Sequence, residues 1–363
     1  MEGDANTVIV RWRDGVPPAA DASDAIVVED PPRRLTDVDR AMFDRGFLRV
    51  DEGGGALRYL RSSKIADPNV TGGRTEATIQ MSNFGKHVRF ANQLFQYSFL
   101  KLYGLRNNAA PEAPEWAGEK IFGIPHRGLG APLKMRKCDE WSVLDLALWT
   151  MKRPPVDCDF WGYFQNVPPS WRVHRDFLRR LYTPKEPWHA PVERWLARHR
   201  ANGATLVAIH LRRGDYYELG AEKPWFRPVP AALYRRWLGE IWPRLKNPVL
   251  FIASDDRNAV LPAFAEYLPL TAEDAEAEMP EAKFMADFAI MAAADVLAIC
   301  NSSFSRMAAI LAPETQRCFI PSLAAGAFEP YDSWASDRFW QRFGAPEPRP
   351  RSRVPRFLRR YLA

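Results

Sequence analysis

Two adjacent arginines follow a short apolar segment, and their position suggests anion binding. Residues 206–211 read LVAIHL, as expected of a buried strand, and the chain continues with Arg212, Arg213, Gly214 and Asp215. Guanidinium groups at the end of a buried strand are costly unless an anion or a carboxylate meets them, and their planar donors suit a phosphate. For the dipeptide alone, a surface ion pair or two arginines braced by Asp215 is the competing interpretation.

Polar residues also follow two further predicted strands. Ser254 to Asp256 comes after the strand predicted at 249–253, and Asn301 to Ser305 opens a helix after the strand predicted at 296–300. Hydroxyls and backbone N–H groups at a helix N-terminus can bind an anion, although serine and asparagine are also common helix caps. Because ligands bind at the carboxyl ends of strands in open α/β sheets, three such strand ends favour a ligand site.

Alternating strands and helices would position these groups. Beyond residue 204, strands are expected at 206–211, 249–253, 296–300 and 318–320, and helices at 231–245, 283–294 and 304–311. Short apolar strands that alternate with helices indicate an α/β protein with a parallel sheet covered on both faces.

The first half of the chain gives weaker patterns. Helices are expected at 94–102, with Gly104 as the C-terminal cap, and at 174–182 and 191–199. Strand-like runs occur at 8–12 and 25–28, but residues 1 to about 80 otherwise suggest an irregular part of the first domain. The proline-containing segment 183–204 is the predicted domain boundary.

Composition excludes several classes of protein. The chain has 363 residues, 47% hydrophobic and 26% charged, which excludes a small disulfide scaffold and a wholly disordered chain. Four widely spaced cysteines suggest buried thiols rather than zinc ligands. No apolar run approaches a membrane span and no signal peptide is evident, so a cytoplasmic location is expected.

The net charge of +6 comes from the six arginines of residues 349–363, without which acidic and basic residues are equal in number. Since no nucleic-acid recognition motif is visible, no nucleic-acid partner is expected. The same arginines alternate with bulky apolar residues, which suits peripheral contact with an anionic membrane, although a solvated disordered end is the alternative.

The segment His210 to Tyr216 resembles the HxRRGDY motif of the alpha-1,2-fucosyltransferases, which use GDP-fucose and are related to the alpha-1,6- and protein O-fucosyltransferases. Further segments match that family in the correct order. They are 90–97, similar to GNQxFQYA, Gly162 to Gln165, similar to GYFQ, and Asp287 through 301–305, similar to DLxLM…NSSFSWW. With Ser254 to Asp256, the resemblance covers roughly residues 83–322.

This resemblance implies a GT-B fold, in which two Rossmann-like domains face each other across a cleft. The expected division is an acceptor-side domain at 1–190, a domain that binds the GDP-sugar at 200–340 and a basic tail at 345–363. The implied enzyme is an inverting glycosyltransferase that moves L-fucose from GDP-fucose to a hydroxyl of a glycan or lipid-linked oligosaccharide. An alpha-1,2 linkage, a role in surface polysaccharide or glycolipid synthesis, and no metal or other cofactor are expected.

The resemblance also assigns site residues. Arg212 is expected to contact the donor diphosphate, where charge develops on the departing GDP. The other donor-binding candidates are His210 and Asp256 near the nucleoside, Ser303, Phe304 and Ser305 near the phosphates, and Arg213, Asp255 and Asn301. The candidates on the acceptor side or at the cleft are Asn92, Gln93, Tyr163 and Gln165.

Inversion requires a base for the acceptor hydroxyl, and a carboxylate is the usual choice. Asp215, Glu218 and Glu222 follow the arginines closely, and the sequence does not decide among them; Asp215 and Glu218 are the catalytic candidates. Asp215 has a competing role in orienting Arg212 or Arg213, because an aspartate beside an arginine favours its weakly basic charged form.

Departures from the family pattern keep other functions open. Ala91 replaces a glycine, and Arg306 and Met307 replace paired tryptophans. The alternatives are a GT-B transferase with another nucleotide sugar or a peptide acceptor, and a nucleotide-binding protein without catalysis. Asp157 and Asp159 form a DxD pattern, typical of metal-dependent transferases of a different fold but common by chance.

Overall fold

The computed structural model describes residues 7–12, 23–29, 31, 35–53, 56–69, 77–86, 88–138, 144–279, 281–335 and 339–346. The predicted basic tail lies almost wholly outside these residues. The described chain divides into two compact units, the first ending at Tyr182 and the second beginning at Thr183. Within the described part, no helix combines the length and apolarity needed to cross a membrane.

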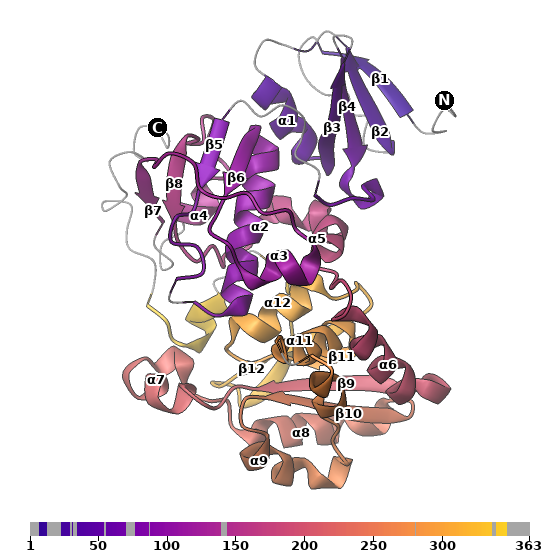
Figure 1. The fold of residues 1–363 in the computed structure, drawn as a ribbon. Coiled ribbons are helices and arrows are strands. Elements are labelled where there is room, and N and C mark those ends of the chain that lie inside the picture. Colours follow the sequence, from indigo (N-terminus) through magenta and orange to yellow (C-terminus); the bar gives the residue numbers. More distant parts are fainter. Residues whose placement is uncertain are drawn as a thin grey trace. The chain divides into compact units, whose positions relative to one another are not determined.

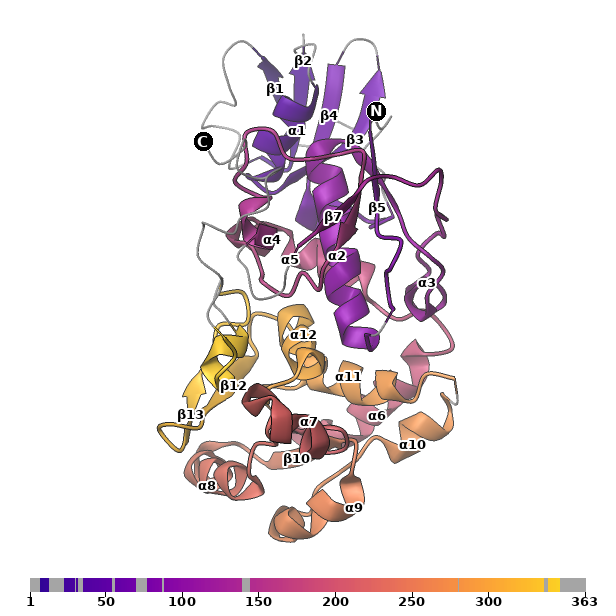
Figure 2. The same cartoon turned by 90° about the vertical axis from the view of Figure 1, so that its left-hand side faces the viewer.

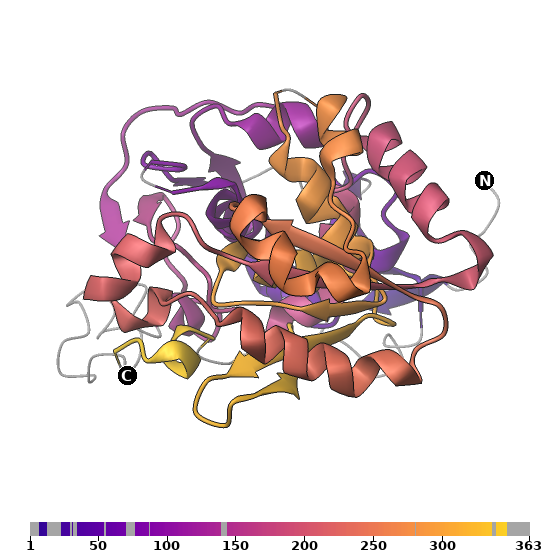
Figure 3. The ribbon, with the colours of Figure 1, turned by 90° about the horizontal axis from the view of Figure 1, so that it is seen from below.

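The second unit contains a five-stranded sheet in the order β10-β9-β11-β12-β13. Its strands are β9 (Thr205–Leu211), β10 (Pro248–Ser254), β11 (Val296–Ala298), β12 (Arg317–Ser322) and β13 (Ala327–Pro330). The first four in the order are parallel, and β13 pairs with β12 in the antiparallel sense, as the gold hairpin in Figure 3 shows. The predicted α/β class with a parallel sheet is therefore confirmed.

Helices cover both faces of this sheet (Figures 1 and 2). One face carries α8 (Ala231–Ile241) and α9 (Arg257–Val260); the other carries α6 (His189–His199), α11 (Phe284–Ala293) and α12 (Ser303–Leu311). Ile209 packs in one core with Trp237 of α8, whereas the Phe251 ring lies 5.2 Å from that of Trp195 of α6. Two short helices complete the unit, α7 (Tyr216–Glu222) and α10 (Glu273–Ala277).

The helix predicted at 231–245 is shorter than expected. It ends at Ile241, and Trp242–Arg244 forms a separate 3₁₀ turn. Pro243 is the physical reason, because proline lacks the N–H that would continue the helix and its ring clashes with the preceding turn. Other 3₁₀ turns lie at 62–64, 169–174, 201–203, 224–226, 261–267 and 339–343.

The first unit has a second parallel sheet, in the order β6-β5-β8-β7. Its strands are β5 (Ala77–Gln80), β6 (Ala109–Glu112), β7 (Met135–Lys137) and β8 (Cys158–Trp161). The long helix α2 (Phe90–Asn107) packs on this sheet through an aromatic core in which Phe99 stacks on Phe164 with ring centroids 3.7 Å apart. Shorter helices are α3 (Ala117–Phe122), α4 (Leu144–Ala147) and α5 (Arg175–Leu181).

The strand-like runs predicted at 8–12 and 25–28 are confirmed as strands, but the prediction that residues 1 to about 80 are otherwise irregular is wrong. They contain a four-stranded sheet of order β1-β2-β4-β3 and a helix: β1 (Thr7–Arg11), β2 (Ala25–Glu29), α1 (Leu35–Phe43), β3 (Phe47–Gly53) and β4 (Ala56–Arg61). Val38 and Met42 of α1 bury one face of the sheet against Ile26 and Tyr59. Charged residues interrupt the apolar pattern of β3 and β4, so packing rather than local propensity determines these two strands.

The predicted cap at Gly104 is also wrong. The helix α2 continues through Gly104 to Asn107, and Asn108 caps it in the left-handed conformation, with φ of 51°. A Cβ at Gly104 would lie 2.6 Å from the carbonyl oxygen of Ala109, so glycine is required where the chain turns back against the helix. A close approach of this kind has no local sequence signal.

This contact predicts opposite effects for two helical glycines. Gly104→Ala should lower the free energy of unfolding by about 1–3 kcal/mol, because the methyl group overlaps a backbone carbonyl. Gly239→Ala in α8, where a Cβ meets nothing within 4 Å, should raise it by roughly 0.5–1 kcal/mol through helix propensity. Differential scanning calorimetry would measure both variants; equal shifts in the same direction would contradict the packing argument.

Candidate functional site

The three polar strand ends predicted from the sequence lie at one edge of the second unit's sheet. Strand β9 pairs with β10 on one side and β11 on the other, all in the parallel sense, so their carboxyl ends are neighbours. Leu211 at the end of β9 is in register with Ser254 at the end of β10. The residues after these strands therefore meet through sheet order, although they are far apart in the sequence.

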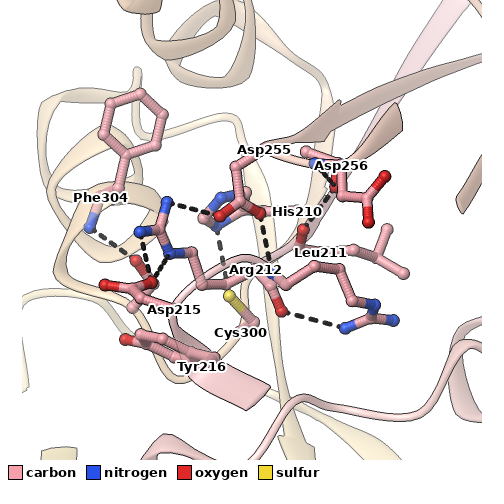
Figure 4. Close-up of polar contacts among 12 residues, drawn as sticks. His210, Leu211, Arg212, Asp215, Tyr216, Asp255, Asp256, Cys300 and Phe304 are labelled. Atoms are coloured by element: carbon pink, nitrogen blue, oxygen red, sulfur yellow. Dashed lines mark hydrogen bonds and ion pairs between the residues drawn. The ribbon is translucent and has the colours of Figure 1, made fainter. Parts of the chain in front are cut away.

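Arg212 is held between two carboxylates (Figure 4). Its Nε and Nη2 donate to Asp215 Oδ1 at 3.1 and 2.6 Å, and its Nη1 lies 3.0 Å from Asp255 Oδ2. The Arg212 side chain is 14% exposed, and the Asp215 and Asp255 side chains are 32% and 26% exposed. The guanidinium is thus fixed in direction by residues from two strand ends.

The contacts leave part of the guanidinium uncommitted. A guanidinium has five N–H donors, and each of its three nitrogens contacts one of these carboxylates. Each terminal nitrogen carries a second N–H that can bind a phosphate oxygen. An incoming anion would therefore meet a cation already oriented, while the two carboxylates oppose the anion's charge.

Arg213 has a different environment from Arg212. It is buried, its backbone N–H donates to Asp255 Oδ1 at 2.7 Å, and its Nη1 donates to the carbonyl of Arg212 at 3.0 Å. Asp255 consequently contacts both arginines, one through a guanidinium and one through the backbone. Arg213 thus stabilises the end of β9 through backbone contacts, whereas the guanidinium of Arg212 is held by carboxylates.

Gly214 leaves room for the carboxylate of Asp255 beside Arg212. A Cβ on Gly214 would overlap Oδ2 of Asp255, the oxygen that pairs with Arg212. Any side chain at this position would displace the carboxylate. The glycine of the motif is therefore explained by the close approach of Asp255.

His210 lies behind Arg212 in a buried environment, with Nδ1 3.2 Å from the sulfur of Cys300. Burial, reinforced by the positive charges of Arg212 and Arg213, lowers the pKa of His210 to about 3. Burial likewise raises the pKa of the Cys300 thiol to about 11. Both groups are neutral near pH 7, so the arginines carry the positive charge at this edge of the sheet.

The N-terminus of α12 follows β11 at the same edge. Ser302 is its N-cap, with its Oγ accepting from the Phe304 N–H at 3.3 Å, and Ser305 is fully buried against the Cys300 backbone. Ser303 and Phe304 are partly exposed. Of the predicted phosphate-side residues, Ser303 and Phe304 are accessible, whereas Ser305 stabilises the turn.

Asn301 connects this turn to the segment after α7. Its Nδ2 donates to the carbonyls of Trp225 and Arg227, both at 2.8 Å, and its own carbonyl accepts from the Tyr216 hydroxyl at 2.7 Å. These bonds tie both ends of the α7 segment to the end of β11. Predicted as a donor-binding residue, Asn301 has its amide committed to the protein backbone.

Asp256 is likewise committed in part. Its Oδ1 accepts from the Ala259 N–H at 3.2 Å and caps α9, while Ser254 Oγ donates to the carbonyl of Leu211 at 2.8 Å. Serine and aspartate are common helix caps, so this role agrees with their residue types.

Next to Asp256, Arg257 forms ion pairs with Glu276 and Asp287 that the sequence analysis did not predict. Arg257 donates from Nη1 to Glu276 at 2.8 Å and from Nη2 to Asp287 at 3.2 Å. Burial raises the pKa of Asp287 to about 7, against the opposing effect of Arg257. Asp287 stands in a matched segment, but Glu276 has no sequence signal, because its role depends on where α10 packs.

Three carboxylates lie along one face of α7. Asp215 is its N-cap, and Glu218 and Glu222 follow at helical spacings of three and four residues. Both glutamates are exposed. With a rise of 1.5 Å per residue, Glu218 is about 4.5 Å and Glu222 about 10 Å further along the helix axis than Asp215.

The acceptor-side candidates lie in the first unit, where the structure joins two of them. Gln165 Nε2 donates to Asn92 Oδ1 at 2.6 Å, linking the matched segments at 90–97 and 162–165. Gln96, which was not singled out, strengthens this link by donating to the Gly162 carbonyl at 2.9 Å. Gln93 packs over the turn at Gly85, and the Tyr163 ring lies 6.2 Å from that of Trp161.

The DxD pattern does not form a metal-binding pair. Asp157 Oδ1 accepts from the Thr78 N–H at 2.9 Å, whereas Asp159 accepts from the N–H and the hydroxyl of Ser82 at 2.9 and 2.6 Å. The two carboxylates thus bind separate groups. In the described residues, no three His, Cys, Asp or Glu side chains gather as metal ligands.

The residues that depart from the family pattern are structural. Ala91 is 3% exposed in the first turn of α2. Arg306 is 1% exposed, and its Cζ lies 4.5 Å from the centre of the Phe339 ring, a cation–π contact. Arg306 therefore anchors the segment at 339–343 against α12.

The chain matches no protein-family model and no curated protein sequence. Among solved structures, fucosyltransferase NodZ from Bradyrhizobium has 14% identity and a TM-score of 0.47, over 71% of this chain and 99% of its own. A mutant of Arabidopsis thaliana FUT1 in complex with GDP has 12% identity and a TM-score of 0.46, over 80% and 76%. POFUT1 in complex with GDP-fucose has 14% identity and a TM-score of 0.42, over 71% and 99%.

The buried histidines predict a distinctive titration. Two of the six histidines, His174 and His210, should stay unprotonated at pH 5, because burial lowers the pKa of each to about 3. Since only the unfolded chain takes up these protons, both residues should make folding less favourable as the pH falls from about 6.5 toward 3. NMR titration of the imidazole resonances measures the protonation of each histidine. Protonation of all six between pH 7 and pH 5 would contradict the buried placement of His174 and His210.

Proposed function

We propose that this chain is a glycosyltransferase that transfers L-fucose from GDP-fucose to a hydroxyl of a glycan or lipid-linked oligosaccharide, with inversion. An alpha-1,2 linkage, in the synthesis of a surface polysaccharide or glycolipid, is the proposed specificity. The observation that carries the proposal is the position of Arg212, which two carboxylates hold at the carboxyl edge of β9 while each terminal nitrogen keeps a second N–H. The segments that resemble the fucosyltransferases supply the choice of donor.

The chemistry requires a cation at this position. When the bond between C1 of the sugar and the phosphate oxygen breaks, negative charge develops on the departing diphosphate. Arg212 and the positive end of the α12 dipole stabilise that charge. These groups supply the electrostatic role directly, so transfer is proposed to need no divalent ion.

The carboxylates around Arg212 have a positioning role in this proposal. Asp215 and Asp255 hold the guanidinium before the donor arrives, which reduces the entropy lost on binding. They also oppose the diphosphate charge, so the donor must share Arg212 with them. Asp215 then orients Arg212 and is a poor base, because its Oδ1 already accepts two N–H donors.

Glu218 is the proposed base. It is exposed on the same face of α7 as Asp215, one helical turn further from the arginine, and it forms no ion pair with the described residues. Glu222 lies a further turn away. A carboxylate near the diphosphate site but not paired with Arg212 can accept the proton of the acceptor hydroxyl.

A nucleotide-binding protein without turnover is the second candidate. The observation that favours it is the neutralisation of Arg212 by two carboxylates, which weakens its attraction for a diphosphate. Hydrolysis of GDP-fucose without acceptor distinguishes the two, because a non-catalytic site binds the donor without releasing fucose.

Nucleotide titration tests the donor site. In EDTA, GDP and GDP-fucose should bind with micromolar Kd and UDP should not. Arg212→Ala should weaken GDP binding by roughly 30-fold or more, since loss of a charge-assisted phosphate contact costs on the order of 2–4 kcal/mol. Arg235→Ala is the matched control, because Arg235 is an exposed arginine paired with Glu266.

Isothermal titration calorimetry gives both results. GDP affinity within threefold of the unmodified protein in Arg212→Ala would contradict the assignment of the arginine. Tight binding of UDP but not GDP would point to another nucleotide sugar, and a requirement for manganese would contradict metal independence.

Variants of α7 test the base. Glu218→Gln should lower kcat for fucosyl transfer by about 10²–10⁴-fold, with little change in GDP affinity, because the amide cannot accept the proton. Glu222→Gln is the control and should change kcat by less than threefold. Transfer assays with a glycan acceptor measure kcat; an unaffected Glu218→Gln enzyme would leave the base to another group.

A further inference from the structure

The connection between α3 and β7 in the first unit is an exposed loop with an apolar tip (Figure 2 shows both elements). Residues 128–133 read GLGAPL, and Arg127 and Lys134 flank them. Residues 123–137 contain four Lys and Arg residues and no acid; the nearest acids along the chain are Glu119 and Asp139. Cations on both sides of an apolar tip are unusual for a surface that meets only water.

The backbone of this loop is fixed by two side chains of the parallel sheet. Gln80, 2% exposed, donates from Nε2 to the Ala131 carbonyl at 2.9 Å and accepts from the Leu133 N–H at 3.2 Å. Glu112 Oε2 accepts from the Gly130 N–H at 2.8 Å. The tip is therefore held in one conformation, which reduces the entropy cost of inserting it into another phase.

Most side chains of the loop and two of the three in β7 are exposed, whereas Ile124 is buried and Arg136 is partly buried. Leu129 is 42% exposed and Met135 is 53% exposed. Strand β7 is at the edge of its sheet. Lys134 and Lys137 are exposed, and neither forms an ion pair with the described residues, although Lys137 Nζ lies 4.3 Å from the centre of the Trp161 ring.

Acidic neighbours balance only the inner part of the loop. Glu112 lies 4.0 Å from Arg127, and Glu119 binds His126 Nδ1 at 2.8 Å. Among the described residues, Lys134 and Lys137 form no ion pair of this kind. The exposed residues of the loop and of β7 thus include two lysines and the apolar Leu129 and Met135.

We propose that residues 123–137 dock on the surface of a lipid bilayer with anionic headgroups. Arg127, Lys134 and Lys137 would lie at the headgroups, and Leu129 and Met135 would enter the acyl boundary. A soluble anionic polymer would satisfy the cations but offers no apolar layer for the tip. Residues 123–137 lie outside the predicted tail in the sequence, and the proposal does not depend on the donor site.

Vesicle sedimentation with the full chain tests the proposal. Binding is expected to vesicles of equimolar phosphatidylcholine and phosphatidylglycerol, and not to phosphatidylcholine alone. The double variant Arg127→Glu with Lys134→Glu should bind at least tenfold more weakly, and Leu129→Ser with Met135→Ser at least threefold more weakly.

Matched controls carry the same changes elsewhere on the surface. Lys185→Glu with Lys246→Glu and Leu268→Ser with Leu323→Ser alter exposed residues of the second unit and should change binding by less than twofold. Repeating the loop variants in a chain with Arg356, Arg359 and Arg360 replaced by glutamate separates the contribution of the tail. The loop variants should lower vesicle binding by the same factor with either tail.

Several outcomes would overturn the proposal. They are no binding to anionic vesicles, equal losses in loop and control variants, or loss on charge reversal without loss on the serine substitutions, which would indicate a site for a soluble anion. Circular dichroism checks folding of each variant. If the charge-reversal pair does not fold, Lys137→Glu serves in its place, because its side chain is exposed, and it should bind at least threefold more weakly.

Discussion

The ion pairs of Arg212 with Asp215 and Asp255 are the interaction on which the organisation of the candidate site depends. They join the end of β9 to the end of β10 and to the first residue before α7. Asp255 can reach Arg212 only because Gly214 has no side chain and because Leu211 and Ser254 are in register. A shift of one residue in either strand would separate the three charges.

Arg212, Asp215 and Asp255 form a cluster that rests on two buried, neutral side chains, with the buried Arg213 beside it. His210 and Cys300 lie beneath it as an unprotonated imidazole and a protonated thiol. Charges interact more strongly where water is excluded. Asn301 and Tyr216 contribute differently, since their hydrogen bonds attach the α7 segment to the end of β11 and thereby place the carboxylates of that helix.

The parallel sheet of the first unit uses its carboxyl edge in a comparable way. Gln80 and Glu112, at the ends of β5 and β6, bond to the loop that precedes β7. Asn92 and Gln165 bond to each other beside the start of α2. In each unit, therefore, short parallel strands place polar side chains at one edge, and loops are attached there.

The sequence by itself determined the alternation of strands and helices after residue 204 and the polar residues at each strand end, because apolar periodicity and turn chemistry are local properties. The resemblance also selected Asn92 and Gln165, which the structure shows to be bonded to each other. Only the tertiary structure decided that Arg212 is shared by two carboxylates while Arg213 braces the backbone, and that Asn301 and Asp256 cap and tether. It alone revealed the sheet of residues 7–61 and the close approach at Gly104. These features depend on the order and register of strands distant in the sequence, which no local pattern specifies.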